Sequence, residues 1–95
     1  MPYIKKNRRL EFDESISKIV NSAVNEGELC YCIYRLLQLY CKKFDREKLF
    51  NFNIISQCIT AVECAKLEFY RKIASPYEDK KIKENGDILW QPNIL

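Results

Sequence analysis

The 95-residue sequence contains no histidine and only two glycines. Without histidine the chain cannot form a Ser-His-Asp or Cys-His catalytic pair, a zinc site with histidine ligands or an imidazole proton shuttle. With only Gly27 and Gly86, it cannot form a P-loop, a G-x-G-x-x-G nucleotide-binding turn or a β-fold with many glycine-rich turns. We therefore expect a protein that is not an enzyme. Chemistry based on Lys, Tyr or Cys alone is the remaining catalytic alternative.

Long apolar runs are also missing. No run approaches the ~18 residues of a membrane-spanning helix, and the first residues lack the hydrophobic region of a signal peptide. We expect one soluble, cytoplasmic domain over residues 1–95, with a basic arm over 1–9 and an apolar tail over 87–95. A domain of this size buries only about 60 to 65% of its unfolded surface, so self-association is an expected source of stability.

The charge is modest but unevenly placed. The net charge is +3, and the first nine residues contain four basic residues and no acidic one. These are Lys5, Lys6, Arg8 and Arg9. The arm could add phosphate contacts, so weak nucleic-acid binding is one alternative. A bare basic arm is an unspecific signal, however, and we do not expect nucleic acid as the main partner.

The cysteines are odd in number and lie in apolar helical patterns, so we interpret them as reduced packing residues. They are Cys30, Cys32, Cys41, Cys58 and Cys64. On a helix, Cys30 and Cys32 point to nearly opposite sides, and no histidine or C-x-x-C pair completes a metal site. We expect no metal and no cofactor.

Apolar residues at helical spacing predict an all-α fold, a small bundle of three main helices plus a short fourth. The first helix is expected to have Asn7 or Asp13 as N-cap and to end at Gly27. The second is expected from about residue 28 to 44. It carries two apolar stripes, which predicts contacts on two of its sides, either inside a bundle or against another subunit.

The third helix is expected over residues 54–74, after a loop over 45–52 and with Asn53 as N-cap. Ser75-Pro76-Tyr77-Glu78 matches a capping box with proline at the first helical position, which predicts a bend or break and a new helix at Pro76. That helix is expected to stop at Asn85-Gly86. The apolar tail is expected to dock either on its own chain or on a neighbour.

One lysine falls inside an apolar stripe. On a helical wheel Lys66 lies between Ile59 and Val62, and Glu63 and Tyr70 lie within one turn of it. A buried lysine requires a partner. Either Lys66 extends to the surface beside Glu63, or it lines an anion-binding pocket with Tyr70 at a helix or subunit interface.

Two further groups of side chains combine cations with aromatics. The first, at the end of the third helix, includes Arg71 and Tyr77, residue types that bind phosphates by bidentate contacts and by stacking. Because acidic residues follow closely, an ordinary solvated face is the alternative. The second is Tyr31 and Arg35, one turn apart on the second helix, which form either a stacked surface pair or a contact with a subunit or ligand.

Four segments resemble a family of short proteins of unknown function from bacteriophages and bacteria: residues 1–5, 27–36, 63–71 and 75–87. The resemblance brings no established catalytic residues, and the apolar tail after Asp87 looks like an addition to the family pattern. It implies a phage setting, in which small oligomeric helical proteins often act by binding. One such class sequesters the cyclic-nucleotide signals of bacterial defence systems.

From these observations we expect a non-enzymatic homo-oligomer that sequesters an anionic, nucleotide-like ligand at its subunit interfaces. If it is phage-encoded, it would work in the host cytoplasm. The alternative is a protein-protein interaction module that inhibits a host protein. The expected ligand-binding residues are Lys66, Tyr70, Arg71, Tyr77, Glu63, Arg35 and Tyr31.

Overall fold

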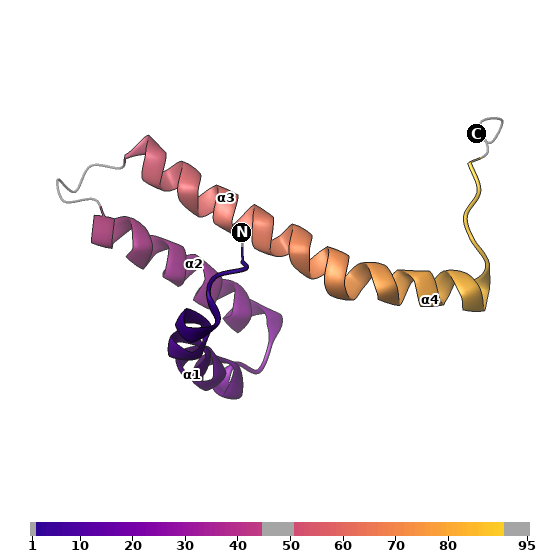
Figure 1. Cartoon of the computed structure of the whole chain (residues 1–95), viewed down its shortest axis with the longest axis horizontal. Helices are drawn as coiled ribbons and strands as arrows, with labels where there is room; N and C mark the ends of the chain where they lie inside the picture. Colours follow the sequence, from indigo (N-terminus) through magenta and orange to yellow (C-terminus); the bar gives the residue numbers. More distant parts are fainter. Residues whose placement is uncertain (1, 45–50, 91–95) are drawn as a thin grey trace.

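The computed structural model describes residues 2–44 and 51–90, and these residues form helices without any strand (Figure 1). The all-α prediction is therefore confirmed. The helices, in chain order, are α1 (Lys6–Ser22), α2 (Glu26–Phe44), α3 (Phe52–Phe69), the π-helical turn η1 (Tyr70–Ala74) and α4 (Ser75–Asn85).

The start of α1 and its junction with α2 differ from the prediction. Neither Asn7 nor Asp13 caps α1, because the helix begins at Lys6 and its N-cap position is the extended Lys5. Gly27 does not end α1 but lies in the first turn of α2. The cap of α2 is Asn25, whose side chain accepts a hydrogen bond from the Glu28 backbone N–H at 2.9 Å. An Asn three residues before a Glu is a recognisable helix start, and this signal overrides the expected stop at glycine.

The cap of α3 also lies elsewhere than predicted. The side chain of Asn51 accepts a hydrogen bond from the backbone N–H of Asn53 at 2.8 Å, so Asn51 is the N-cap and Asn53 the donor. The helix consequently starts at Phe52, inside the segment expected to be a loop. The rest of that expected loop, residues 45–50, lies outside the described residues.

The predicted break at Pro76 is wrong. Ala74 and Ser75 both have helical backbone angles, and Ser75 makes no cap; its backbone N–H instead donates to the carbonyl of Tyr70, five residues back. This wider turn absorbs the missing N–H of Pro76 without interrupting the helix. Residues 52–85 thus form one helix of 34 residues, about 50 Å long. It ends as expected before Gly86, which has a positive φ of 89°.

The main packing contact joins α2 to the first half of α3. The Sγ atoms of Cys41 and Cys58 lie 3.5 Å apart, and the Tyr40 hydroxyl donates to the side-chain oxygen of Gln57 at 3.0 Å. Cys58 is the only buried side chain among the described residues. The expectation of packing cysteines is therefore correct for Cys58, whereas Cys30 is exposed.

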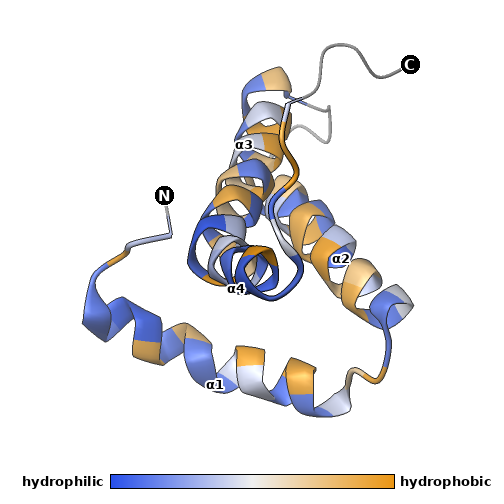
Figure 2. Cartoon of the chain, turned by 90° about the vertical axis from the view of Figure 1, so that its right-hand side faces the viewer, coloured by the Kyte–Doolittle hydropathy of each residue, from blue (hydrophilic) through white to orange (hydrophobic). Residues whose placement is uncertain are grey.

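The chain does not close into a bundle. Figures 1 and 2 show that α1 is set apart from α3, and Figure 1 shows that α4 extends away from α1 and α2. The radius of gyration is 18.5 Å, against about 12 Å for a compact domain of this length. The accessible area is 9371 Å², against about 5,700 Å² for a compact monomer of this mass. Much apolar surface that a globular protein would bury is therefore exposed in the single chain.

Candidate functional site

A polar cluster of Tyr3, Glu68 and Arg71 joins the N-terminal arm to the long helix. The Tyr3 hydroxyl donates a hydrogen bond to Glu68 Oε1. Arg71 donates to the same oxygen through Nε, at 3.0 Å, and through Nη2, and Nη2 also contacts the Tyr3 hydroxyl at 3.4 Å. Glu68 and Arg71 are one helical turn apart, so the helix presents them together to the arm.

The three groups shift one another's protonation. The hydrogen bonds from Arg71 and from Tyr3 lower the pKa of Glu68. The hydrogen bond to Glu68 raises the pKa of Tyr3, and the same carboxylate raises the pKa of Arg71. Each shift favours a neutral Tyr3, a charged Glu68 and a charged Arg71, which is the state in which all the hydrogen bonds form.

Lys66 lies at the surface of the single chain. Its side chain is 71% exposed, and its Nζ lies 3.7 Å from Glu63 Oε1. Tyr70, one turn further along, is 58% exposed. The structure thus brings Lys66, Glu63 and Tyr70 onto one stretch of helix, with no second element of the same chain closing over them in the described residues.

Tyr77 lies beyond the π-helical turn, on α4. Its ring is 57% exposed, and Lys81 Nζ lies 5.5 Å from the ring centroid. The Lys81 ammonium is shared with Glu84 at 3.2 Å. Tyr77 is therefore on the same continuous helix as Lys66 and Arg71, and its aromatic face is already used by a cation.

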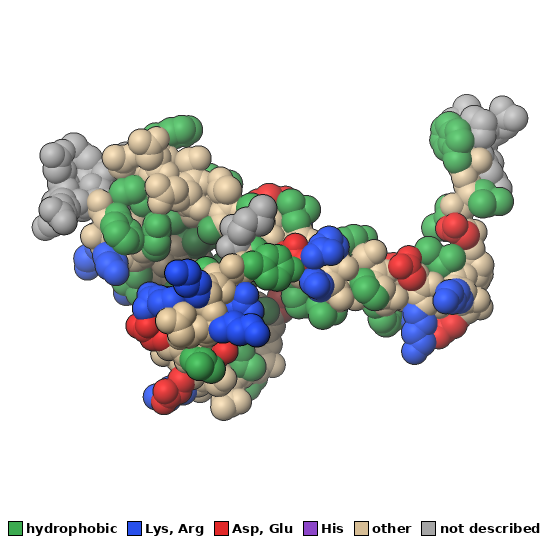
Figure 3. Space-filling view, in the orientation of Figure 1, with side chains coloured by type: hydrophobic (Ala, Val, Ile, Leu, Met, Phe, Trp, Pro, Cys, Tyr) green, Lys and Arg blue, Asp and Glu red, His purple; other side chains and the backbone are tan. Residues whose placement is uncertain are grey.

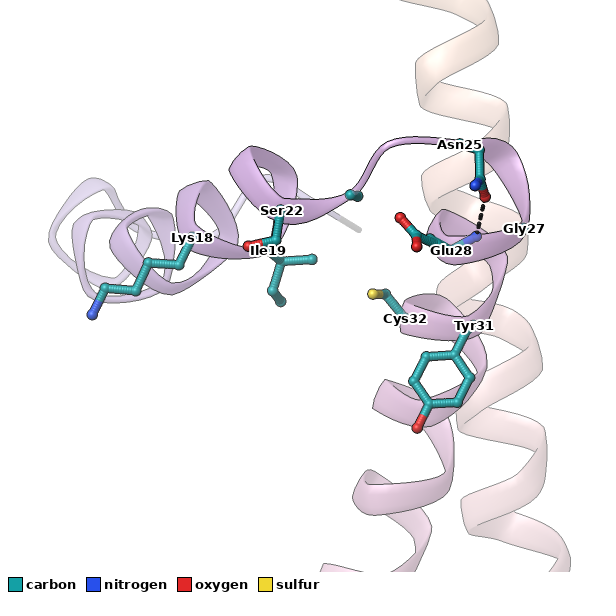
Figure 4. Close-up of a pocket in the computed structure, with 9 residues that line it drawn as sticks. Lys18, Ile19, Ser22, Asn25, Gly27, Glu28, Tyr31 and Cys32 are labelled. Atoms are coloured by element: carbon teal, nitrogen blue, oxygen red, sulfur yellow. Dashed lines mark hydrogen bonds between the residues drawn. The ribbon is translucent and has the colours of Figure 1, made fainter.

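Tyr31 and Arg35 lie on α2 and are not brought to the other predicted site residues. Arg35 donates a hydrogen bond to Gln38 on its own helix. Tyr31 lines a pocket of about 680 Å³ between the end of α1 and the start of α2, together with Lys18, Glu28 and Cys32 (Figure 4). In the described part of the chain, no hydrogen bond or ion pair joins Tyr31 or Arg35 to the long helix.

A second hollow, which the sequence did not predict, lies between the N-terminal arm, α1 and α2. We call this hollow the α1–α2 groove; its volume is about 840 Å³. Its apolar lining includes Phe12, Ile16, Ile19, Leu36, Leu39 and Tyr40. Arg9, Asp13 and Lys43 add charge to it. The helical spacing of these residues was visible in the sequence, but the face that they form together depends on how α1 and α2 cross.

The part of the chain that the structure describes contains neither a metal-ligand cluster nor a candidate membrane span. No three Cys, Asp or Glu side chains meet there as a set of metal ligands. None of the helices there combines the length and the apolar character that crossing a bilayer requires.

Comparison with curated proteins and with solved structures found no significant match. A family model described as a domain of unknown function, DUF6899, matches residues 1–88. The matched region contains the arm, every helix described above and the Tyr3–Glu68–Arg71 cluster, and it ends before Leu89 and Trp90. The chain therefore belongs to the DUF6899 family.

Proposed function

We propose that the protein is a non-enzymatic binding protein that acts as a homo-oligomer and sequesters an anionic, nucleotide-like ligand at the interface between copies. The observation that carries this proposal is the exposed apolar surface of the single chain, in which Cys58 alone is buried among the described residues. Such a surface is typical of a protein that reaches its stable state only with a partner.

The ligand is assigned to the long helix because cationic and aromatic side chains gather there. Lys66 is held near Glu63 by a long, exposed ion pair, which contributes little and which an anion can displace. Arg71 uses its Nε and Nη2 edge for Glu68 and Tyr3, which fixes the guanidinium and leaves Nη1 for a phosphate. Tyr70 provides a stacking face, and Tyr77 offers the side of its ring that Lys81 does not cover. In the oligomer, Tyr31 and Arg35 of another copy would complete the site.

The resemblance to phage proteins adds a biological setting to this proposal. A phage-encoded binder of this kind would act in the cytoplasm of the infected cell as a counter-defence sponge for a signalling nucleotide. The absence of histidine and of glycine-rich phosphate loops supports binding without turnover.

Thermal unfolding in the presence of a panel of cyclic oligonucleotides tests the ligand proposal. A ligand present at 100 times its dissociation constant should stabilise the folded state by about 2.7 kcal/mol. Lys66→Gln should abolish that stabilisation. Arg8→Gln is the matched control, because Arg8 forms a similarly exposed pair with Glu11 on α1 and lines neither hollow. If no member of the panel stabilises the protein, or if both variants lose the effect equally, the proposal fails.

A host protein is the second candidate partner, and the described part of the apolar tail favours it. Ile88 and Trp90 are 94% and 86% exposed, and both follow the end of α4. An extended apolar segment of this kind can be the anchor of a protein interface. One purified host protein that binds with fixed stoichiometry, and no longer binds the Trp90→Ser variant, would favour this candidate over the nucleotide ligand.

A further inference from the structure

We infer that two copies of the chain exchange their long helices, so that the second half of the helix of each copy packs into the α1–α2 groove of the other. This inference rests on the self-association in the proposed function and names the surfaces that meet. The contact is reciprocal, as a two-fold dimer requires: the same helix and the same groove are used on both sides.

The geometry of the long helix prevents it from covering itself. The helix runs without interruption through Pro76, and α2 packs only along its first half, around Gln57 and Cys58. Beyond Arg71, in the described residues, α4 contacts chiefly the π-helical turn that precedes it on the same rod. A rigid helix cannot fold back, so its second half must be covered by another molecule or remain exposed.

That second half carries an apolar stripe. Phe69, Ile73 and Tyr77 follow one another at intervals of four residues and therefore lie on one side of the helix. Their exposed fractions are 65%, 56% and 57%. Figure 3 shows apolar side chains exposed along this part of the helix and on the tail that follows. We call the three residues the distal stripe.

The α1–α2 groove has the shape and chemistry to receive the distal stripe. It is hollow and mainly apolar, and Phe12, Ile16 and Leu36 in its lining remain 43%, 53% and 67% exposed. An amphipathic helix laid in an apolar groove is a common mode of recognition. Both surfaces carry charges of either sign at their edges: Arg9, Lys43 and Asp13 line the groove, and Glu78, Asp79, Lys80 and Lys81 follow Tyr77 on α4.

The exposed area agrees with a second copy as the occupant. The chain exposes about 3,600 Å² more than a compact monomer of its mass. Two chains together therefore have about 7,200 Å² of such excess area, and obligate dimers bury about 2,000 to 5,000 Å² or more over both partners, so two reciprocal helix-in-groove contacts have enough surface to form. A second copy of the chain is always available as a partner, and every copy has the same groove.

Photo-crosslinking from position 77 tests the exchange. A benzophenone amino acid replaces Tyr77, and the variant is mixed in equal amounts with isotope-labelled protein of the same sequence. Irradiation should give crosslinks between labelled and unlabelled chains, from position 77 to residues 12–19 or 36–43. Crosslinks only within one chain, or between chains but only at other residues, would overturn the inference.

Complementation between two variants provides an independent readout. Leu36→Asp damages the groove and Ile73→Asp damages the stripe, so each variant alone should associate at least 10-fold more weakly than the natural chain. In a mixture, the intact stripe of the Leu36→Asp copy can pack into the intact groove of the Ile73→Asp copy. The mixture should therefore form a heterodimer, whereas each variant alone should stay largely monomeric. Leu10→Asp is the control, because Leu10 is 74% exposed on α1 and does not line the groove.

Circular dichroism would verify that each variant keeps its helices. If an aspartate variant loses helix, the alanine variant at the same position, Leu36→Ala or Ile73→Ala, is used in its place. If the mixture behaves like the separate variants, the exchange is wrong. If the chain is an oligomer with crosslinks elsewhere, only this inference fails and the proposed ligand binding stands. Loss of nucleotide stabilisation without loss of the crosslinks would remove the ligand and leave the exchange intact.

Discussion

The hydroxyl of Tyr3 donates a hydrogen bond to the carboxylate of Glu68, a residue 65 positions away in the sequence. This contact ties the N-terminal arm to the middle of the long helix, at the turn that also holds Arg71. The arm in turn lines one side of the α1–α2 groove through Pro2, Tyr3 and Ile4. One hydrogen bond therefore connects the candidate ligand site on the helix with the wall of the groove.

We predict that Tyr3→Phe frees the arm without unfolding the helices. The substitution removes the hydroxyl that bonds Glu68 and Arg71 but keeps the apolar ring. Trypsin should then cleave after Lys5 and Lys6 several-fold faster, while the circular dichroism spectrum stays the same. Tyr34→Phe is the control, because Tyr34 lies 64% exposed on α2. Equal cleavage rates in the two variants would show that Tyr3 does not hold the arm.

The arm contact should also depend on pH in a defined direction. Because Arg71 and Tyr3 lower the pKa of Glu68, the contact is fully formed above the ordinary glutamate value of about 4.3 and is lost as the pH falls through the lowered value. At the basic end, the raised pKa of Tyr3 preserves the hydrogen bond beyond the ordinary tyrosine value of about 10, until the hydroxyl ionises.

An NMR titration that follows the amide of Ile4 measures the acidic transition. Its midpoint should lie below the ordinary value for glutamate, and Glu68→Gln should remove the transition. A midpoint at or above that value would contradict the cluster geometry, since a carboxylate bonded to Arg71 and Tyr3 resists protonation.

Two cap substitutions distinguish the observed helix boundaries from those expected from the sequence. Asn51→Ala should lower the free energy of unfolding by about 1 kcal/mol, because its side chain satisfies the first turn of α3. Ser75→Ala should cost less than about 0.5 kcal/mol, because Ser75 lies inside a continuous helix. Urea denaturation measures both values. The reverse order would restore the predicted capping box and the break at Pro76.

Cys58→Ala should destabilise the chain more than Cys30→Ala. Cys58 is buried against Cys41 and the carbonyl of Leu37, and burial raises the pKa of its thiol above the ordinary value. Removing the sulfur leaves a small cavity between α2 and α3 and should cost about 1 kcal/mol. Cys30 is exposed and its loss should have no measurable effect. Equal urea midpoints for the two variants would mean that α2 does not pack on α3 through Cys58.

The helices were predictable from the sequence because helical spacing of apolar residues is a local signal. The ends of the helices were less predictable, because several nearby residues can cap a helix and the sequence does not show which of them does. Asn25 with Glu28 starts α2 and carries Gly27 into the helix, and Asn51 rather than Asn53 starts α3. At Pro76 a π-helical turn lets the helix continue past the proline, and the capping-box pattern in the sequence does not indicate this.

The candidate site was only partly predictable. Lys66, Glu63 and Tyr70 share one stretch of helix, as local spacing implied. The role of Tyr3 and the α1–α2 groove depend on contacts between distant segments, which periodicity does not encode. Helical spacing identified an apolar stripe on the third helix, but not the extent to which one chain leaves it uncovered.

Self-association is the prediction on which the proposed binding function rests. Sedimentation equilibrium measures this most directly, over a range of protein concentrations and with circular dichroism on the same samples. We predict a helical species with a mass of at least twice 11.3 kDa, which falls to 11.3 kDa only when dilution dissociates it. A helical species of 11.3 kDa at every concentration would contradict self-association.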